Sequence, residues 1–361
     1  MKLIFKPTIP VIAPTLPKVG DTNFKEHYGE VNRNMLFVEI ELYIRQATEL
    51  YIIPFIGRPI YDDIAAKFHA NATLSDEQKF FLQLLQDTVA YYTMRHAYPK
   101  KRSVMASMGI VENSPKDGSN PASAIAYKQT LWDLTLNADK FLDNVIFYMQ
   151  EQVAAGVADF DLWKDDPSYT KNVHPLFRTT DVFQKYYNIH NSRRTLQVFY
   201  PSIRVVERKY LKPILCDEML AELYEQIEKN TLSTKNKILL EYVREVAAFA
   251  TIYEGVELNN VVLEADGVRA LSSDDGSDKR SSVLQAFKDS IAAIKWKCDE
   301  NMRMFSQDLI VFLNKNADDY PSWKASDCNK NISNSDCGCK DASFACSCNT
   351  QSMNGRGGVF L

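Results

Sequence analysis

Apolar residues recur at helical spacing in two distant stretches of the chain, and both stretches contain a proline. The first, YIIPFIGRPIYDDI, occupies residues 51–64, and the second, YLKPILCDEMLAEL, occupies residues 210–223. A shift of 159 residues places Pro54 on Pro213 and matches apolar with apolar positions along the stretch. Self-similarity at a fixed offset is the sequence signature of an internal repeat.

The similarity continues after these stretches once one residue is dropped. Residues 74–110 align with residues 232–268 without a gap, so that the Leu-Ser pair opening one segment meets the pair opening the other. Each copy then has a polar loop and a long amphipathic segment, at residues 121–150 and 280–314. Two unrelated helical sequences would not share this order of segments. The sequence therefore predicts a tandem duplication.

Each copy is predicted to hold three to four helices and one short extended segment, which makes the fold mainly α. The first helix is expected to end near Pro54. Its counterpart is expected to begin at Pro201, because proline suits a first helical turn, and to end near Pro213. Short helices should follow at about residues 60–68 and 218–229.

Serine is predicted to begin the next helix of each copy, because the side chains of Ser75 and Ser233 can accept hydrogen bonds from the first turn. These helices should run to about residues 96 and 254. SVMASMGIV and NNVVLEADGV then read as extended, with a shared glycine at a positive-φ turn or bulge. The final helix of each copy, about thirty residues long, would measure roughly 45 Å.

Five regions follow from this pattern. They are an extended arm (1–30), a first helical repeat (31–150), a packed connector (151–190), a second helical repeat (191–316) and a cysteine-rich tail (317–361). Four prolines between residues 7 and 17 exclude a helix in the arm, yet the arm is too apolar for a free tail. It should lie across its own domain or reach a neighbouring subunit. The aromatic connector should pack across both halves.

Composition narrows the class of protein. The chain has 361 residues, of which 45% are hydrophobic and 24% charged, so it can form one large domain or two of average size. A formal net charge of −4 argues against a general nucleic-acid binder. Small basic clusters such as Arg193-Arg194 are attributed to solvated helix ends or loops. The prolines interrupt any secretory signal, and no apolar run has membrane-spanning length, so we expect a soluble protein with no membrane partner.

Motifs for enzymatic chemistry are absent from the sequence. It contains no phosphate-binding loop, dinucleotide fingerprint, HExxH motif or nucleophile elbow, and its five histidines are scattered. Ser168 and Lys171 match an SxxK pattern without its partner motifs. The acidic pair Asp62-Asp63 is interpreted as part of a solvated face. We therefore expect no catalytic residues, no bound organic cofactor and no enzymatic activity.

Five of the seven cysteines are concentrated in residues 328–348. After Cys328 come two C-x-C pairs, which are Cys337 with Cys339 and Cys346 with Cys348. Four thiolates could hold a tetrahedral zinc ion, although C-x-C is less diagnostic than C-x-x-C. Two other interpretations stay open: an unordered tail, or disulfides. Disulfides are disfavoured in a reducing cytoplasm but could form in a particle after its release from a cell.

The order of these segments resembles a known family. A helix ending in Y-x-x-P-[FI]-[IL], a second short helix, a polar turn starting Leu-Ser, a longer helix and a final long helix are similar to the head-to-tail connector, or adaptor, proteins of tailed bacteriophages. The resemblance is closest to the double-length forms of Bacteroides and crAss-like phages and prophages. It covers roughly residues 30–315, in two copies.

The resemblance implies a structural virion protein, made in the host cytoplasm. Its homo-oligomeric ring would join the portal to the tail, or to other ring proteins, around a channel through which DNA passes without sequence recognition. A mildly acidic surface would repel phosphate and let DNA slide. The duplication, the arm and the tail depart from small adaptors and leave the ring copy number open. The alternative is a non-enzymatic, zinc-binding helical scaffold or interaction module.

Overall fold

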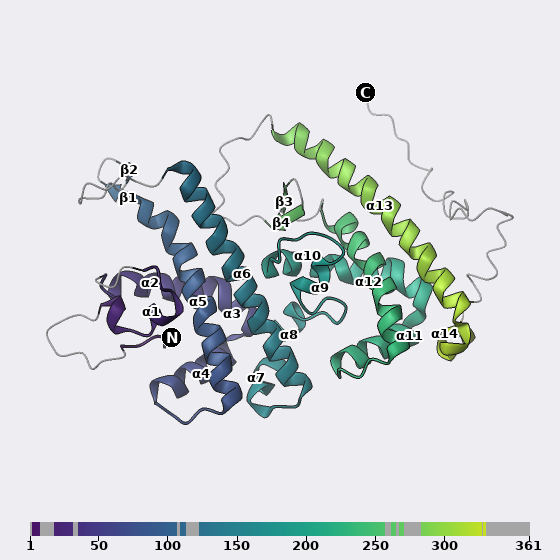
Figure 1. Cartoon of the computed structure of the whole chain (residues 1–361), viewed down its shortest axis with the longest axis horizontal. Coiled ribbons are helices and arrows are strands. Elements are labelled where there is room, and N and C mark those ends of the chain that lie inside the picture. Colours follow the sequence, from purple (N-terminus) through teal and green to yellow (C-terminus); the bar gives the residue numbers. More distant parts are fainter. Residues whose placement is uncertain are drawn as a thin grey trace. The chain divides into compact units, whose positions relative to one another are not determined.

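The computed structural model divides into two compact units (Figure 1). Unit 1 comprises residues 1–197 with 266–269, and unit 2 comprises residues 198–265 with 270–361. The structure describes residues 2–7, 18–31, 35–106, 109–112, 123–256, 261–264, 267–270, 283–326 and 328–329.

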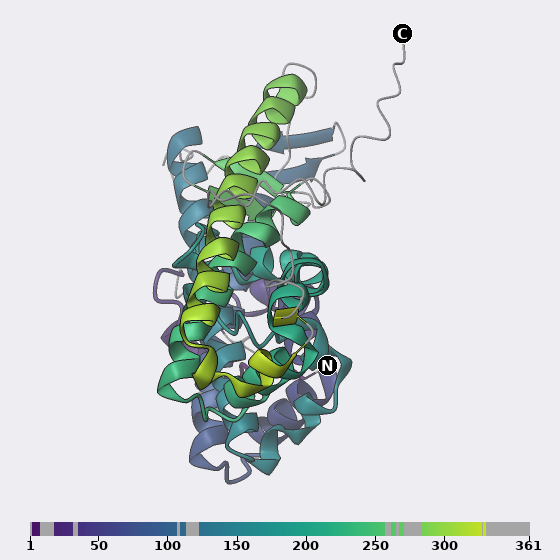
Figure 2. The same ribbon diagram turned by 90° about the vertical axis from the view of Figure 1, so that its right-hand side faces the viewer.

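Unit 1 is built around two long helices, α5 (Asp76–Arg102) and α6 (Ala124–Ala154), which lie side by side (Figures 1 and 2). Their facing apolar residues, such as Leu85, Val89, Leu142 and Ile146, are fully buried. The other elements before α6 are η1 (Val19–Asp21), α1 (Phe24–His27), α2 (Val38–Ala47), η2 (Thr48–Ile52), α3 (Ile53–Ile56), α4 (Arg58–His69), β1 (Ser103–Ala106) and β2 (Gly109–Glu112). After α6 come η3 (Ala158–Phe160), α7 (Asp161–Lys164), α8 (Pro167–Asn172), α9 (Thr180–Gln184) and α10 (Arg193–Val206), whose last residues belong to unit 2.

Unit 2 repeats this plan. Helix α12 (Thr234–Gly255) packs against α13 (Val283–Lys315), the long yellow-green helix of Figure 2. The remaining elements are η4 (Glu207–Leu211), α11 (Lys212–Glu228), β3 (Val261–Glu264), η5 (Ala317–Asp319) and α14 (Pro321–Ala325). Strand β4 (Gly267–Ala270) follows β3 in the chain, but its residues 267–269 are assigned to unit 1. Each long helix pair thus has a two-stranded sheet between its helices in the sequence, β1 with β2 and β3 with β4. The first is antiparallel and pairs Ser103 with Glu112 and Ala106 with Gly109.

The predicted serine caps are confirmed. Ser75 Oγ accepts a hydrogen bond from the Gln78 amide at 3.2 Å, and Ser233 Oγ accepts one from the Asn236 amide at the same distance. The first helix of this pair runs further than predicted, to Arg102, with Pro99 inside it. The extended segments form the two hairpins, and in each the shared glycine is the first residue of the second strand.

The predicted helix start at Pro201 is wrong, whereas the helices break three residues after Pro54 and Pro213, close to their predicted ends. Helix α10 begins at Arg193, where Ser192 Oγ accepts a hydrogen bond from the Thr195 amide at 3.2 Å, and Pro201 lies inside the helix on its exposed side. The first helix also continues past Pro54, because a π-helical turn, η2, replaces the α-helical bond that proline cannot make. In that turn the Ile53 amide donates to the Thr48 carbonyl.

The beginning of the arm packs on unit 1. Leu3, Ile4 and Phe5 are buried, and Gln86 donates a hydrogen bond to the Ile4 carbonyl at 2.6 Å. The Lys6 amide donates to Asn23 Oδ1 at 3.0 Å. Residues 2–7 therefore cross their own unit, which is one of the two arrangements expected from the sequence. The other prolines of the arm, Pro10, Pro14 and Pro17, lie outside the described residues.

Both copies extend beyond the boundaries expected from the sequence. The segment 151–190 lies entirely in unit 1, where Trp163, Phe177 and Phe183 are fully buried. Residues 317–326, expected as the start of the tail, form η5 and α14 in unit 2. The packing of the connector across both halves stays a prediction.

Candidate functional site

Each copy contains a sharp helix break with the same backbone geometry. The π-helical turns η2 and η4 are followed by a short α-helical turn that ends at Gly57 in unit 1 and at Cys216 in unit 2. Gly57 has φ 76° and ψ 157°, and Cys216 has φ 64° and ψ 166°. Side chains clash with the backbone in this region of φ and ψ, so it is nearly confined to glycine. Cys216 is therefore a backbone outlier.

A tryptophan completes each break. Trp163 of α7 donates its indole N–H to the Phe55 carbonyl at 3.2 Å, and Trp323 of α14 donates to the Ile214 carbonyl at 2.7 Å. Both tryptophans are fully buried. Carbonyl groups in the last turn before a break lack helical partners, and the indole supplies one. Sequence reasoning missed this pair, although a Trp-Lys dipeptide at 163 and 323 could have revealed it.

Polar side chains close the break of unit 1. Asp166 begins α8 by accepting a hydrogen bond from the Ser168 amide at 2.8 Å, and a Cβ atom added to Gly57 would lie 2.6 Å from its Cγ atom. Asn172 donates its amide to the carbonyls of Pro54 at 2.9 Å and Phe55 at 3.3 Å. Only glycine fits between this backbone and the carboxylate.

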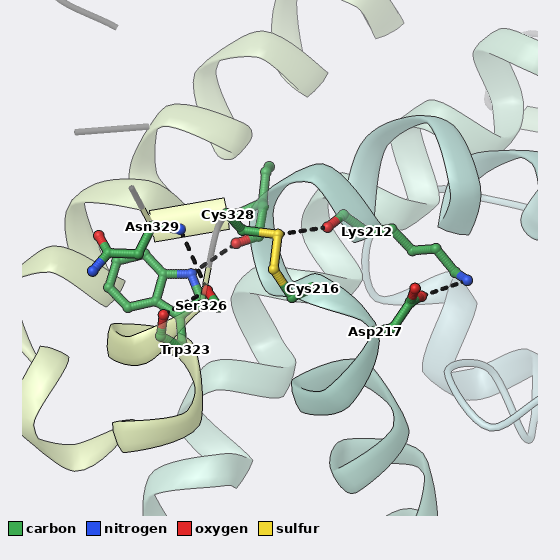
Figure 3. The surroundings of a disulfide bond; sticks show 8 residues. Lys212, Cys216, Asp217, Trp323, Ser326, Cys328 and Asn329 are labelled. Carbon is green, nitrogen blue, oxygen red and sulfur yellow. Dashed lines mark hydrogen bonds and ion pairs between the residues drawn. A yellow bond between two sulfur atoms is a disulfide. The ribbon is translucent and has the colours of Figure 1, made fainter. Parts of the chain in front are cut away.

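A disulfide closes the break of unit 2. Cys216 is bonded to Cys328, and their Cα atoms are 5.9 Å apart (Figure 3). Lys212 pairs with Asp217 at 2.5 Å beside it, and Ser326 donates its hydroxyl to the Trp323 carbonyl at 2.6 Å. The shift that places Trp163 on Trp323 also places Asp166 on Ser326 and Ser168 on Cys328. The disulfide therefore joins the two positions that correspond to Gly57 and Ser168 in the first copy.

A cluster of charged side chains lies in the interior of unit 1. Asp139 and Asp143 of α6 face the first residues of α10. Arg193 pairs with Asp143 at 2.9 Å, and Arg194 pairs with Asp139 at 2.8 Å. Arg193 is fully buried, so the interpretation of this arginine pair as a solvated helix end is wrong.

Hydrogen bonds satisfy both carboxylates of this cluster. Tyr92 donates to Asp139 at 2.6 Å and Ser192 donates at 2.5 Å, while the Thr180 amide and hydroxyl both donate to Asp143. Burial opposes ionisation of Asp139, but the charge of Arg194 and these hydrogen bonds outweigh it and lower the pKa of the carboxyl below its usual value. The two carboxylates hold the beginning of α9 and the first residues of α10 against α6.

The other residues singled out in the sequence do not converge. Ser168 is buried whereas Lys171 is exposed, so they do not form a nucleophile and base. Asp62 is exposed and Asp63 pairs with Lys67 at 2.8 Å, which confirms a solvated face. The proposed zinc ligands Cys337, Cys339, Cys346 and Cys348 lie outside the described residues. Where the chain is described, no three His, Cys, Asp or Glu side chains gather closely enough to hold a metal ion.

Comparison with protein families identifies the repeat. A family model described as a family of unknown function (DUF6712) matches two segments, residues 52–173 and 211–333, which together make up more than half of the chain. Each segment begins at the last residue of the π-helical turn and ends beyond the tryptophan, so it contains both the residue at the helix break and the tryptophan. No curated protein and no solved structure matches the chain. Within the described ranges, no helix has an apolar stretch of the length that crosses a bilayer.

Proposed function

The chain belongs to the DUF6712 family through both of its copies, and we propose that it is a structural, non-enzymatic protein of a tailed-phage virion. In this proposal it is made in the host cytoplasm and forms a homo-oligomeric ring. The ring connects the portal to the tail or to other ring proteins, and DNA passes through it without sequence recognition.

The observation that carries the proposal is what the two copies have in common. They share the π-helical turn, the helix break, the tryptophan that satisfies the break and the serine cap, all of which organise backbone. The buried cluster around Asp139 and Asp143 pairs these carboxylates with Arg193 and Arg194, and we interpret it as a packing contact. A duplication that keeps architecture rather than reactive side chains supports a scaffold.

Exposed apolar side chains on the long helices support assembly with other chains. On α6 they are Ile125, Leu136 and Phe147, at intervals of eleven residues, which places them within about 40° of one another around the helix. On α13, Trp296, Met304 and Val311 also share one side, and Trp296 is 67% exposed. Large exposed apolar side chains aligned on one helix face are typical of protein interaction surfaces.

Light scattering coupled to size-exclusion chromatography, followed by electron microscopy with portal and tail proteins, tests the proposal. We expect a ring or a stable complex with these neighbours. The Trp296→Ala variant should weaken that assembly, whereas Ile238→Ala, which removes an exposed apolar side chain of α12, should not. A protein that stays monomeric and joins neither portal nor tail would contradict the proposal.

The alternative function, a zinc-binding scaffold, is tested by the zinc content of the protein and by the effect of zinc loss on partner binding. If the two C-x-C pairs bind zinc, elemental analysis of the reduced full-length protein should find about one zinc per chain. A variant with Cys337→Ser and Cys339→Ser should then lose it. The connector proposal expects the same assembly with and without the zinc, whereas the scaffold alternative expects partner binding to be lost with it.

A further inference from the structure

We propose that Cys216 and Cys328 form a thiol–disulfide exchange site. In a reducing compartment the two residues are thiols. When the protein meets a small disulfide oxidant of the glutathione class, they close into the disulfide and link Cys328 covalently to the helix break of unit 2. This inference concerns the chemistry of unit 2 and holds whatever the protein assembles with.

The backbone of Cys216 is the first argument. Its φ of 64° lies in a region that L-residues rarely adopt, and the equivalent residue of the other copy is Gly57, which adopts it freely. Glycine would serve the break equally well as a piece of backbone. A strained non-glycine residue at one copy of a duplicated break indicates that its side chain has a role, and for cysteine that role is the sulfur.

Access is the second argument. Cys216 and Cys328 are both only partly buried, so a small thiol or disulfide can reach them. Cys298 of α13 is the internal contrast, because it is buried and burial raises its pKa to about 12. A thiol that does not ionise neither attacks disulfides nor reacts with alkylating agents. Accessible disulfides are the ones that exchange with the thiol pool.

The reduced state is the third argument, because unit 2 keeps its contacts when the sulfur bond opens. The Trp323 indole remains hydrogen-bonded to the Ile214 carbonyl, which holds α14 against the break without help from sulfur. Cys328 Sγ lies 3.4 Å from the Lys212 carbonyl oxygen, which can accept a hydrogen bond from the thiol once it is reduced (Figure 3). Opening should therefore remove the covalent link between Cys328 and the helix break and leave α14 in place.

The exchange balances in two steps. One cysteine thiolate attacks a sulfur of oxidised glutathione, forms a mixed disulfide and expels one glutathione thiolate. The second cysteine thiolate attacks the protein sulfur of that mixed disulfide and expels the other glutathione. The two protons lost by the cysteines end on the two glutathione thiols. The cysteines are oxidised and one glutathione disulfide is reduced.

Thiol trapping of the full-length protein across a series of glutathione ratios tests the assignment. Each sample is alkylated under native conditions and mapped by peptide mass spectrometry. We expect Cys216 and Cys328 to be alkylated together at reducing ratios and to be linked to each other at oxidising ratios, with Cys298 unlabelled in both. A pair that stays open at every ratio, stays closed at a cytoplasmic ratio, or links Cys216 to another cysteine would overturn the proposal.

Limited proteolysis supplies a second measurement. Oxidation should slow cleavage after α14 severalfold in the natural protein, and the Cys328→Ser variant should be cleaved at the reduced rate at every glutathione ratio. Cys298→Ser is the matched control and should respond to oxidation like the natural protein. If cleavage of the Cys328→Ser variant still slows on oxidation, another cysteine controls the segment and the proposal fails.

Discussion

At the helix break of unit 1, a glycine lies against the carboxylate of Asp166, whereas at the break of unit 2 a cysteine in nearly the same conformation is bonded to Cys328. The backbone and the indole hydrogen bond are shared, so these are the parts that the repeat needs in order to fold. The residues that close the break differ. The comparison separates what the scaffold requires from what one copy has added, which is a closure that depends on redox conditions.

Removing the shared tryptophan should have the largest effect. Trp163→Ala and Trp323→Ala each delete a fully buried side chain and its indole hydrogen bond to a carbonyl of the break, so each should lower the free energy of unfolding of its own unit by about 3–5 kcal/mol. Hydrogen exchange measured by peptide should place the loss in unit 1 for the first variant and in unit 2 for the second. Trp296→Ala, at an exposed position, is the control and should change stability by less than about 0.5 kcal/mol. An equal loss of stability in both units would contradict the prediction that each tryptophan stabilises only its own unit.

Reduction of the disulfide should affect only unit 2. The bond joins residues separated by 112 positions, and cross-linking a loop of that length typically stabilises a protein by about 2–4 kcal/mol through the unfolded chain. Urea unfolding with and without a reductant, followed by hydrogen exchange, should show that loss in α11 and α14. The exchange rates of α4 and α5 serve as the control and should not change. A uniform loss across the chain would contradict the assignment.

Substituting the residues that close each helix break should have a smaller effect on stability. Gly57→Ala places a Cβ atom against Asp166 at a positive φ and should cost about 1–3 kcal/mol. Asp166→Ser gives unit 1 the residue found in unit 2. Combined with Gly57→Ala, it should relieve the contact with the added Cβ atom but not the strain of alanine at a positive φ. In unit 2, Cys216→Gly should be more stable than Cys216→Ser by about 1 kcal/mol, because both lack the disulfide and only glycine suits the backbone. Urea midpoints measure all four variants.

Lowering the pH should produce the smallest difference in stability between the two units. The pKa of Asp139 is lowered in the folded protein, so its contribution to stability is complete above the unfolded pKa of about 3.9 and is lost as pH falls through the lower folded value. Unit 1 should therefore lose stability below about pH 4, as measured by unfolding midpoints against pH. Asp139→Asn should flatten that dependence, and a variant with an unchanged profile would argue against this carboxylate.

The sequence predicted the parts of this fold that depend on neighbours along the chain. The periodic apolar positions gave the long helices, and Ser75 and Ser233 gave their first residues. The tandem copy of the pattern predicted the duplication, which the two family matches confirm. These features are local because a helix bonds residues four apart and a cap acts within one turn.

Contacts between distant segments could not be predicted in the same way. Trp163 and Trp323 reach carbonyls 108 and 109 residues away in the sequence, and nothing near either tryptophan indicates its partner. Arg193 and Arg194 look like a solvated basic pair until α6 provides two buried carboxylates 50 and 55 residues earlier. The pairing of Cys216 with Cys328 could not be predicted, because four more cysteines follow Cys328 and offer other partners.

The π-helical turns constrain how the length of each repeat can vary. A π-helical turn holds one residue more than the α-helical turn it replaces, and here it lets the chain pass Pro54 and Pro213. Deleting one codon within η2 or η4 would restore α-helical bonding and drive the proline ring against the carbonyl four residues earlier. Such a deletion should be accepted only together with replacement of the proline, so relatives should gain or lose these two features as a pair.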